Sequence, residues 1–150
     1  MDDATIIEHA LAAVVQGQRT PAEVLGIDAS IVDGLYDLGV RAHDMGKHLH
    51  ADGIFQRCVA LDPFAARNWI ALAACRQAME RPLDAGELYQ IAGLMTDDVR
   101  PIAYAAACFA EAGETDRALA LAEHARRGNA GEVSIQPWLA VVEHYTGSAP

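Results

Sequence analysis

Three histidines lie close together in the chain, at His43, His48 and His50, and Asp44 follows the first of them. Histidine and aspartate side chains both bind zinc, so this cluster is the first candidate for chemistry. Gly46 is expected to end a helix between the histidines, so their side chains need not converge. No glutamate follows at the spacing that hydrolytic zinc helices use. We therefore expect no metal site, and expect His43 and His48 to belong to a binding surface instead.

The nucleophilic side chains are few and isolated. The cysteines are odd in number and lack the paired motif of a disulfide framework or zinc site, so we expect small core residues at Cys58, Cys75 and Cys108. The serines lack the context of a catalytic glycine elbow, and no phosphate-binding loop is present. The carboxylates Asp97 and Asp98 fall at a helix boundary, where solvation and capping are ordinary roles. The sequence therefore predicts a protein that is not an enzyme and holds no cofactor.

Length and charge restrict the partners. The 150 residues suffice for one domain, and 52% are hydrophobic, which is typical of a packed globule. The formal net charge of -10 repels phosphate backbones and anionic lipid, which argues against nucleic acid and membrane partners. The chain starts with Met1, Asp2 and Asp3, where a secretory signal needs positive charge, and its longest apolar run, 102–110, is too short to span a bilayer. We expect a cytoplasmic protein without membrane insertion.

Apolar residues recur at helical spacing along most of the chain, and capping residues, prolines and glycines mark the ends of the helices. Thr20, Pro21 and Glu23 form a capping box at the start of one short helix, and Ser30 with Asp33 is expected to open the next. We expect no strands. The first expected helix ends near residue 17, and the fourth follows residue 46 and ends at residue 61. The others lie at residues 21–26, 30–46, 65–79, 82–95, 102–112, 115–127 and 135–145. Because the loops are short, neighbouring helices should pair as antiparallel hairpins.

Most of these helices fit a 34-residue tetratricopeptide period, in which two helices approach through small residues beside an aromatic one. The first unit supplies Leu35, Leu38, Gly39, Gly46, Ala51, Phe55 and Pro63. The second supplies Trp69, Leu72, Ala73, Ala85, Tyr89 and Ala92, with Glu80 at the usual turn glycine and Asp97 at the usual proline. The third is shifted by one residue and supplies Ile102, Ala105, Ala106, Phe109, Gly113, Ala118, Ala122 and Ala125. Its second helix lacks an aromatic residue, so we expect it to be the loosest unit.

The predicted fold is therefore all-α, with three helical hairpins in a right-handed superhelical stack. Residues 1–30 form an N-terminal helical extension, residues 31–132 the repeats, and residues 133–150 a capping helix and tail. The apolar stripe of the first helix needs a partner, which is either the rest of the chain or a second copy. Spacing alone does not decide between them.

The first helix of each hairpin is expected to line a concave groove, where function should lie. Its candidate residues are Tyr36, Val40 and His43 from the first unit, Arg67, Ile70, Ala74 and Gln77 from the second, and Ala103, Tyr104, Ala107 and Ala110 from the third. A groove of small apolar residues with a polar rim suits an extended peptide with spaced apolar anchors. A clamp for a C-terminal carboxylate, which tetratricopeptide co-chaperones use, needs lysine, asparagine and arginine at positions that here hold Tyr36, Val40, Ala71, Arg100 and Tyr104. Only Arg100 fits, so we reject that clamp.

Three runs of sequence carry a family resemblance: residues 69–79, which end Ala-Cys-Arg-Gln-Ala-Met; Leu35-Tyr36 followed by Gly46-Lys47; and residues 104–109 followed by Gly113-Glu114. They resemble the class II chaperones of bacterial type III secretion systems, over roughly residues 31–127. The resemblance implies three tetratricopeptide repeats that hold two hydrophobic translocator proteins in the bacterial cytoplasm before export. It implies that a short translocator segment with spaced proline and leucine anchors binds in the concave groove.

The same resemblance implies a homodimer formed through the N-terminal region, and in some members a role beside a transcription activator. Carried over by position, the aromatic pocket of the family falls on Tyr36, Val40, His43 and His48. Tyr36 alone keeps the aromatic ring of that pocket, a departure that bears on which anchors it accepts. A peptide-binding adaptor in another assembly and a co-regulator of secretion gene transcription remain as alternatives.

Overall fold

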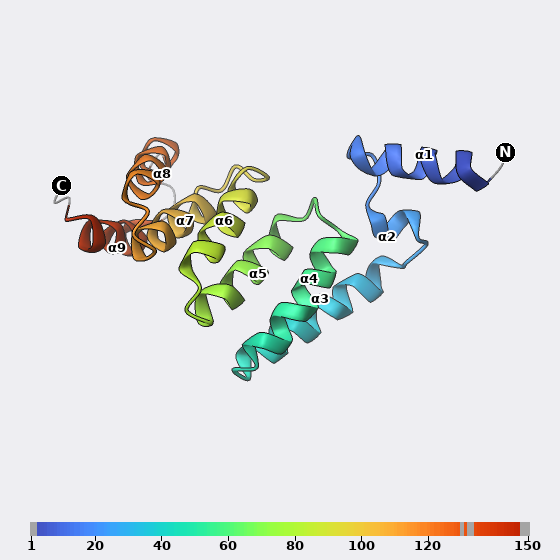
Figure 1. The fold of residues 1–150 in the computed structure, drawn as a ribbon, viewed down its shortest axis with the longest axis horizontal. Coiled ribbons are helices and arrows are strands. Elements are labelled where there is room, and N and C mark those ends of the chain that lie inside the picture. Colours follow the sequence, from blue (N-terminus) through green and yellow to red (C-terminus); the bar gives the residue numbers. More distant parts are fainter. Residues whose placement is uncertain (1–2, 130, 132–133, 148–150) are drawn as a thin grey trace.

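The computed structural model describes residues 3–129, 131 and 134–147, and every regular element in those ranges is a helix. The helices are α1 (Asp3–Val15), α2 (Pro21–Val24), α3 (Ala29–Asp44), α4 (His48–Leu61), α5 (Ala66–Ala78), α6 (Pro82–Gly93), α7 (Arg100–Glu111), α8 (Thr115–Gly128) and α9 (Gln136–Thr146). Figure 1 shows them as a row, with α1 at one end and α9 at the other. The predicted all-helical fold is confirmed. None of the described helices has the length and apolar character needed to cross a bilayer.

Three antiparallel pairs form the body of the row: the first hairpin is α3–α4, the second α5–α6 and the third α7–α8. The second helix of each hairpin also packs against the first helix of the next. Gly39 permits the close approach within the first hairpin, because a Cβ there would lie 2.7 Å from Cε1 of Phe55. This confirms the pairing of small and aromatic residues on which the repeat assignment rests.

The third hairpin is closely packed, contrary to the expectation that it would be the loosest. Ala118, Ala122 and Ala125 of α8 are fully buried. The missing aromatic residue comes from the other helix of the hairpin, since the ring of Phe109 on α7 lies against Gly86 of α6. Small residues on α8 therefore draw it close to α7, and the aromatic ring fills the junction with the hairpin before it.

The starts of α2 and α3 differ in how well the sequence predicted them. The capping box of α2 is confirmed: Thr20 Oγ1 accepts from the Glu23 N–H at 3.1 Å, and Glu23 Oε2 accepts from the Thr20 N–H at 2.6 Å. The predicted capping box of Ser30 with Asp33 is wrong. The N-cap of α3 is Asp28, whose Oδ1 accepts from the Ser30 N–H at 2.8 Å and from the Ser30 hydroxyl at 2.5 Å. Asp28, two residues earlier, therefore has the capping role that we expected of Ser30, and its carboxylate also binds the Ser30 hydroxyl.

The buried apolar residues form two clusters that meet at α5. The first joins α3, α4 and α5 around Phe55, and the second joins α5 to α9 around Phe109. The cysteines Cys58, Cys75 and Cys108 are free and buried in these clusters, as predicted. Burial raises the pKa of the Cys75 thiol to about 11 and that of Cys108 to about 12, so both stay protonated at neutral pH.

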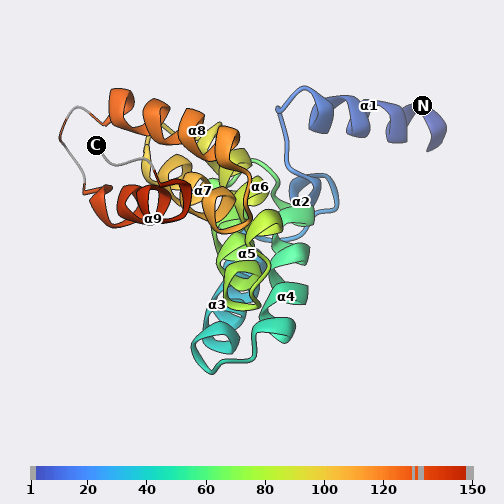
Figure 2. The ribbon, with the colours of Figure 1, turned by 60° about the vertical axis from the view of Figure 1, so that its left-hand side comes forward.

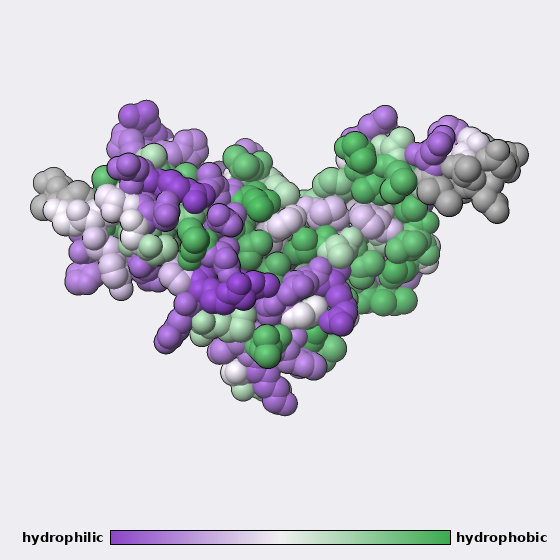
Figure 3. All heavy atoms as spheres, viewed as in Figure 1, coloured by the Kyte–Doolittle hydropathy of each residue, from purple (hydrophilic) through white to green (hydrophobic). Residues whose placement is uncertain are grey.

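The N-terminal extension projects from the stack. α1 packs mainly against α2, and it points away from the hairpins in both Figure 1 and Figure 2. Leu11 and Val15 of α1 are 60% and 85% exposed, and Leu25 and Ile31 just beyond it are exposed as well. Figure 3 shows hydrophobic residues gathered over α2 and the adjoining end of the first hairpin. This end of the molecule is therefore apolar and uncovered.

Candidate functional site

Two first helices, α3 and α5, present the predicted binding residues on one shared surface. We call it the α3–α5 surface: Tyr36, Val40 and His43 of α3 with Arg67, Ile70, Ala74 and Gln77 of α5. Arg67 and Gln77 are exposed, and the other five are half-buried, each with part of its side chain open to solvent. The spacing of three or four residues along each helix explains why they share a face.

Tyr36 lies at the end of this surface nearest the N-terminal extension. Its ring packs on Phe55, with ring centres 5.5 Å apart, and the guanidinium of Arg67 lies 4.7 Å from its ring centre. Arg67 reaches this position across from α5 and pairs there with Asp33 of α3. The ion pair is exposed and so adds little stability, but it orients the guanidinium over the ring. Burial raises the pKa of the Tyr36 phenol, which therefore remains neutral.

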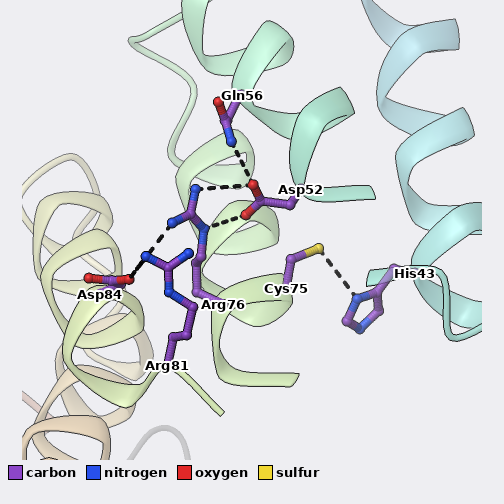
Figure 4. Close-up of polar contacts among 7 residues, drawn as sticks. All are labelled: His43, Asp52, Gln56, Cys75, Arg76, Arg81 and Asp84. Atoms are coloured by element: carbon purple, nitrogen blue, oxygen red, sulfur yellow. Dashed lines mark hydrogen bonds and ion pairs between the residues drawn. The ribbon is translucent and has the colours of Figure 1, made fainter. Parts of the chain in front are cut away.

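His43 and His48 are brought together at the opposite end of the surface. Their Nδ1 atoms lie 3.2 Å apart, and His43 Nδ1 also lies 3.4 Å from Cys75 Sγ, a contact between α3 and α5 that Figure 4 shows. Two ring nitrogens at this distance need one donor and one acceptor, so the tautomers of the two rings are linked. His50 is exposed. Among the residues described, no group of three or more histidines, cysteines and carboxylates is arranged to hold a metal ion.

The second-unit residues continue the surface along α5. Ile70 and Ala74 form its apolar floor. Ile70 packs against the buried cluster around Phe109, and the side chain of Ala74 is a single methyl group. Gln77 forms a polar edge, and its Oε1 accepts a hydrogen bond of 3.2 Å from the Tyr89 hydroxyl. The α3–α5 surface thus has an apolar floor between Arg67 at one end and the Gln77 amide and the His43 imidazole at the other, where His48 of α4 adjoins it.

The third-unit residues lie in a different environment, because α9 packs beside α7. Ala103, Ala107 and Ala110 are only 0%, 2% and 4% exposed. Ala103 and Ala110 share a buried cluster with Leu139 and Val142 of α9 and with Ile135, the residue that precedes α9. Contact between these alanines and a bound peptide stays a prediction, and it would require α9 to move.

Tyr104 is half-buried beside these alanines and links α6 to α9. Its ring centre lies 5.2 Å from that of Tyr89 and 4.4 Å from that of Trp138. Aromatic pairs at such distances are stabilising, and Tyr104 therefore helps to hold α9 on α7. Sequence reasoning identified a capping helix, but not that it would bury the third-unit positions.

One feature of the hairpin junctions was also not expected. The buried Asp52 of α4 forms an ion pair with the half-buried Arg76 of α5, although α4 otherwise buries apolar residues. The sequence held one sign of this pair, because the same repeat position holds an aspartate, Asp52, in the first unit and a glycine, Gly86, in the second.

The chain is similar to known proteins in both sequence and fold. No family model matches it. It is 30% identical to the low calcium response locus protein H of Yersinia pestis over 106 residues, which are 70% of this chain and 63% of that protein. The chain thus spans less than two thirds of the length of this relative.

The solved structures that resemble it cover more of the chain. A type III secretion complex from Aeromonas hydrophila matches with a TM-score of 0.78 and 28% identity, over 92% of this chain and 93% of that chain. The Yersinia enterocolitica type III secretion chaperone SycD, solved with a peptide of the translocator YopD, matches with a TM-score of 0.69 and 26% identity, over 81% and 93% of the two chains. With the repeat pattern and the helical hairpins, these likenesses show that the chain is similar in sequence and in fold to the tetratricopeptide-type chaperones of type III secretion translocator proteins.

Proposed function

We propose that this protein is a cytoplasmic chaperone of a bacterial type III secretion system. It binds a segment of hydrophobic translocator proteins along the α3–α5 surface and keeps them soluble and apart before export. The observation that carries this proposal is the row of half-buried apolar side chains, Tyr36, Val40, Ile70 and Ala74, on two neighbouring first helices. SycD, which is similar in fold, holds a translocator peptide.

The chemistry of the surface favours an extended, apolar peptide. Half-buried apolar groups gain roughly 25 cal/mol for each Å² that a ligand removes from water, so several spaced anchors add up to useful affinity. The polar side chains at the ends, Arg67 and Gln77, can hydrogen-bond a peptide backbone. A non-catalytic role agrees with the buried cysteines, whose raised pKa values leave no thiolate at neutral pH.

A single substitution on the floor of the surface tests the proposal. Ala74→Glu places a carboxylate where an apolar anchor would lie, and burying an unpaired charge is costly. We expect the variant to lose at least about 90% of the translocator that co-purifies from the native bacterium, with unchanged helicity by circular dichroism. Ala120→Glu, at an exposed position of α8, is the matched control and should retain the translocator. Equal recovery by both variants would contradict the proposal.

We also propose that the protein forms a homodimer through the N-terminal extension. The support is the projecting α1 with its exposed Leu11 and Val15, next to the exposed Leu25 and Ile31. An apolar surface of this kind is rare on a protein that stays monomeric. After deletion of the residues before Ala29, light scattering should give the molar mass of one truncated chain. A molar mass of two truncated chains would refute this part of the proposal.

A further inference from the structure

The first two hairpins meet through a two-pronged ion pair between a buried aspartate and a half-buried arginine. Asp52 of α4 is only 4% exposed, and Arg76 of α5 donates to it through Nε to Oδ1 and through Nη2 to Oδ2, the latter at 3.0 Å. Gln56 donates a third hydrogen bond to Oδ2 at 2.5 Å. Arg76 Nη1 also lies 3.7 Å from Asp84 of α6, as Figure 4 shows. One guanidinium thus connects three consecutive helices.

The next junction in the stack uses the same two positions differently. Gly86 of α6 lies one 34-residue repeat after Asp52, and Phe109 of α7 lies 33 residues after Arg76, in the unit that is shifted by one. There the ring of Phe109 lies against Gly86, where an added Cβ would come within 3.0 Å of it. The α4–α5 junction therefore carries an ion pair where the α6–α7 junction carries an apolar contact.

The α4–α5 junction also separates the two buried clusters. The cluster around Phe55 holds α3 and α4 together, and the cluster around Phe109 holds α6 to α9 together, while α5 contributes to both. Direct contact between α3 and α5 is sparse, and it includes the exposed Arg67–Asp33 pair and the contact of His43 with Cys75. The spacing of α3 from α5 is therefore set mainly by how α4 sits on α5.

We propose that the Asp52–Arg76 pair is a positioning device that fixes the spacing of α3 and α5, and through it which peptides the α3–α5 surface accepts. An apolar contact tolerates small rotations of one helix on another, because dispersion is non-directional. A two-pronged ion pair between a buried carboxylate and a half-buried guanidinium is satisfied in one relative orientation, and leaving it unsatisfied leaves the Asp52 charge in a poorly solvated site. The claim about peptides rests on the proposed function, whereas the claim about helix spacing does not.

The test transplants the apolar junction. The double variant Asp52→Gly and Arg76→Phe copies the Gly86–Phe109 contact and removes both charges of the pair, so neither is left without its partner. Spin labels at Asp37→Cys on α3 and Ala78→Cys on α5, both exposed, report the distance between the helices by pulsed electron paramagnetic resonance. The native cysteines are buried and should not label. We expect the distance distribution to broaden or shift while the melting temperature stays within a few degrees of the parent.

Arg76→Lys is the second variant, and it keeps the charge but loses the two-pronged geometry. Arg76→Lys should broaden the distance distribution less than the double variant does. It replaces the double variant in the test if the double variant does not fold. Arg127→Lys, at an exposed pair with Glu123, is the matched control and should change nothing. A distribution that is the same in Arg76→Lys, the double variant and the parent overturns the positioning role.

Translocator recovery then tests the peptide claim. In a co-purification assay that Ala74→Glu abolishes, we expect the double variant to retain at least tenfold less translocator than the parent. Full recovery with a broadened distance distribution overturns the specificity claim. If Ala74→Glu has no effect, the proposed function fails, and the distance measurement still decides the positioning role.

Discussion

Glu80 is predicted to destabilise the fold through its backbone conformation. It lies in the α5–α6 turn with φ of 57°, and no other non-glycine residue in the described part of the chain has a positive φ. The same turn in the other two hairpins holds Gly46 and Gly113, with φ of 73° and 82°. The three turns also share a backbone hydrogen bond. The Arg81 N–H donates to the Arg76 carbonyl, as the N–H groups of Lys47 and Glu114 donate to the carbonyl five residues earlier. Glu80 thus adopts a glycine conformation without being glycine.

The left-handed conformation costs a residue with a Cβ about 1–2 kcal/mol. A glycine variant avoids this cost but loses about 0.4–1 kcal/mol of stability, because glycine has more conformational entropy in the unfolded chain. Glu80→Gly should therefore raise the free energy of unfolding by about 0.5–1 kcal/mol. For a domain of this size, that corresponds to a rise in melting temperature of roughly 1–4 °C.

Thermal unfolding followed by circular dichroism measures this change. Gly113→Glu is the reverse substitution at the equivalent turn, where a Cβ would meet nothing within 4 Å, so the conformational cost acts alone. It should lower the melting temperature by a comparable amount. The reasoning is refuted if Glu80→Gly melts at or below the parent temperature while Gly113→Glu melts no lower.

Three further substitutions test the packing, the burial and the capping. Gly39→Ala should cost about 1–3 kcal/mol of stability in urea unfolding, because its Cβ would lie 2.7 Å from Phe55, whereas Gly34→Ala, with nothing within 4 Å, should be neutral or stabilising. Burial raises the pKa of Cys108 to about 12, so its stabilising effect is complete below about pH 8.5 and is lost as the pH rises toward 12. Stability should fall in that range, and Cys108→Ala should flatten the fall; an equal slope in both proteins would argue against it. Thr20→Ala should cost about 0.5–2 kcal/mol through loss of the cap, and an unchanged midpoint would contradict that.

Features that depend on neighbours in sequence were the ones that sequence reasoning predicted best. The capping box at Thr20 involves residues three apart, and the pairing of Gly39 with Phe55 follows from a repeat whose geometry recurs. The cap of α3 was misassigned because Asp28 and Ser30 both have side chains that can cap. Local pattern does not say which of two nearby acceptors takes an N–H; the backbone conformation does, and Asp28 is extended while Ser30 is already helical.

Features that depend on distant contacts were missed. The periodicity of α7 placed Ala103 and Ala110 on the face that lines the groove, but their burial depends on where α9 packs. Asp52 and Arg76 are 24 residues apart, and their pairing depends on how one hairpin sits on the next. Periodicity identifies the face of a helix, whereas tertiary packing decides what covers that face.

The central claim is that translocator proteins bind on the α3–α5 surface. Photo-crosslinking in the native bacterium tests it most directly, with a photoreactive amino acid placed at Ala74 on that surface or at the exposed Ala120 of α8. The account predicts an adduct with a hydrophobic translocator from position 74 and none from position 120. An adduct from position 120 alone would contradict it.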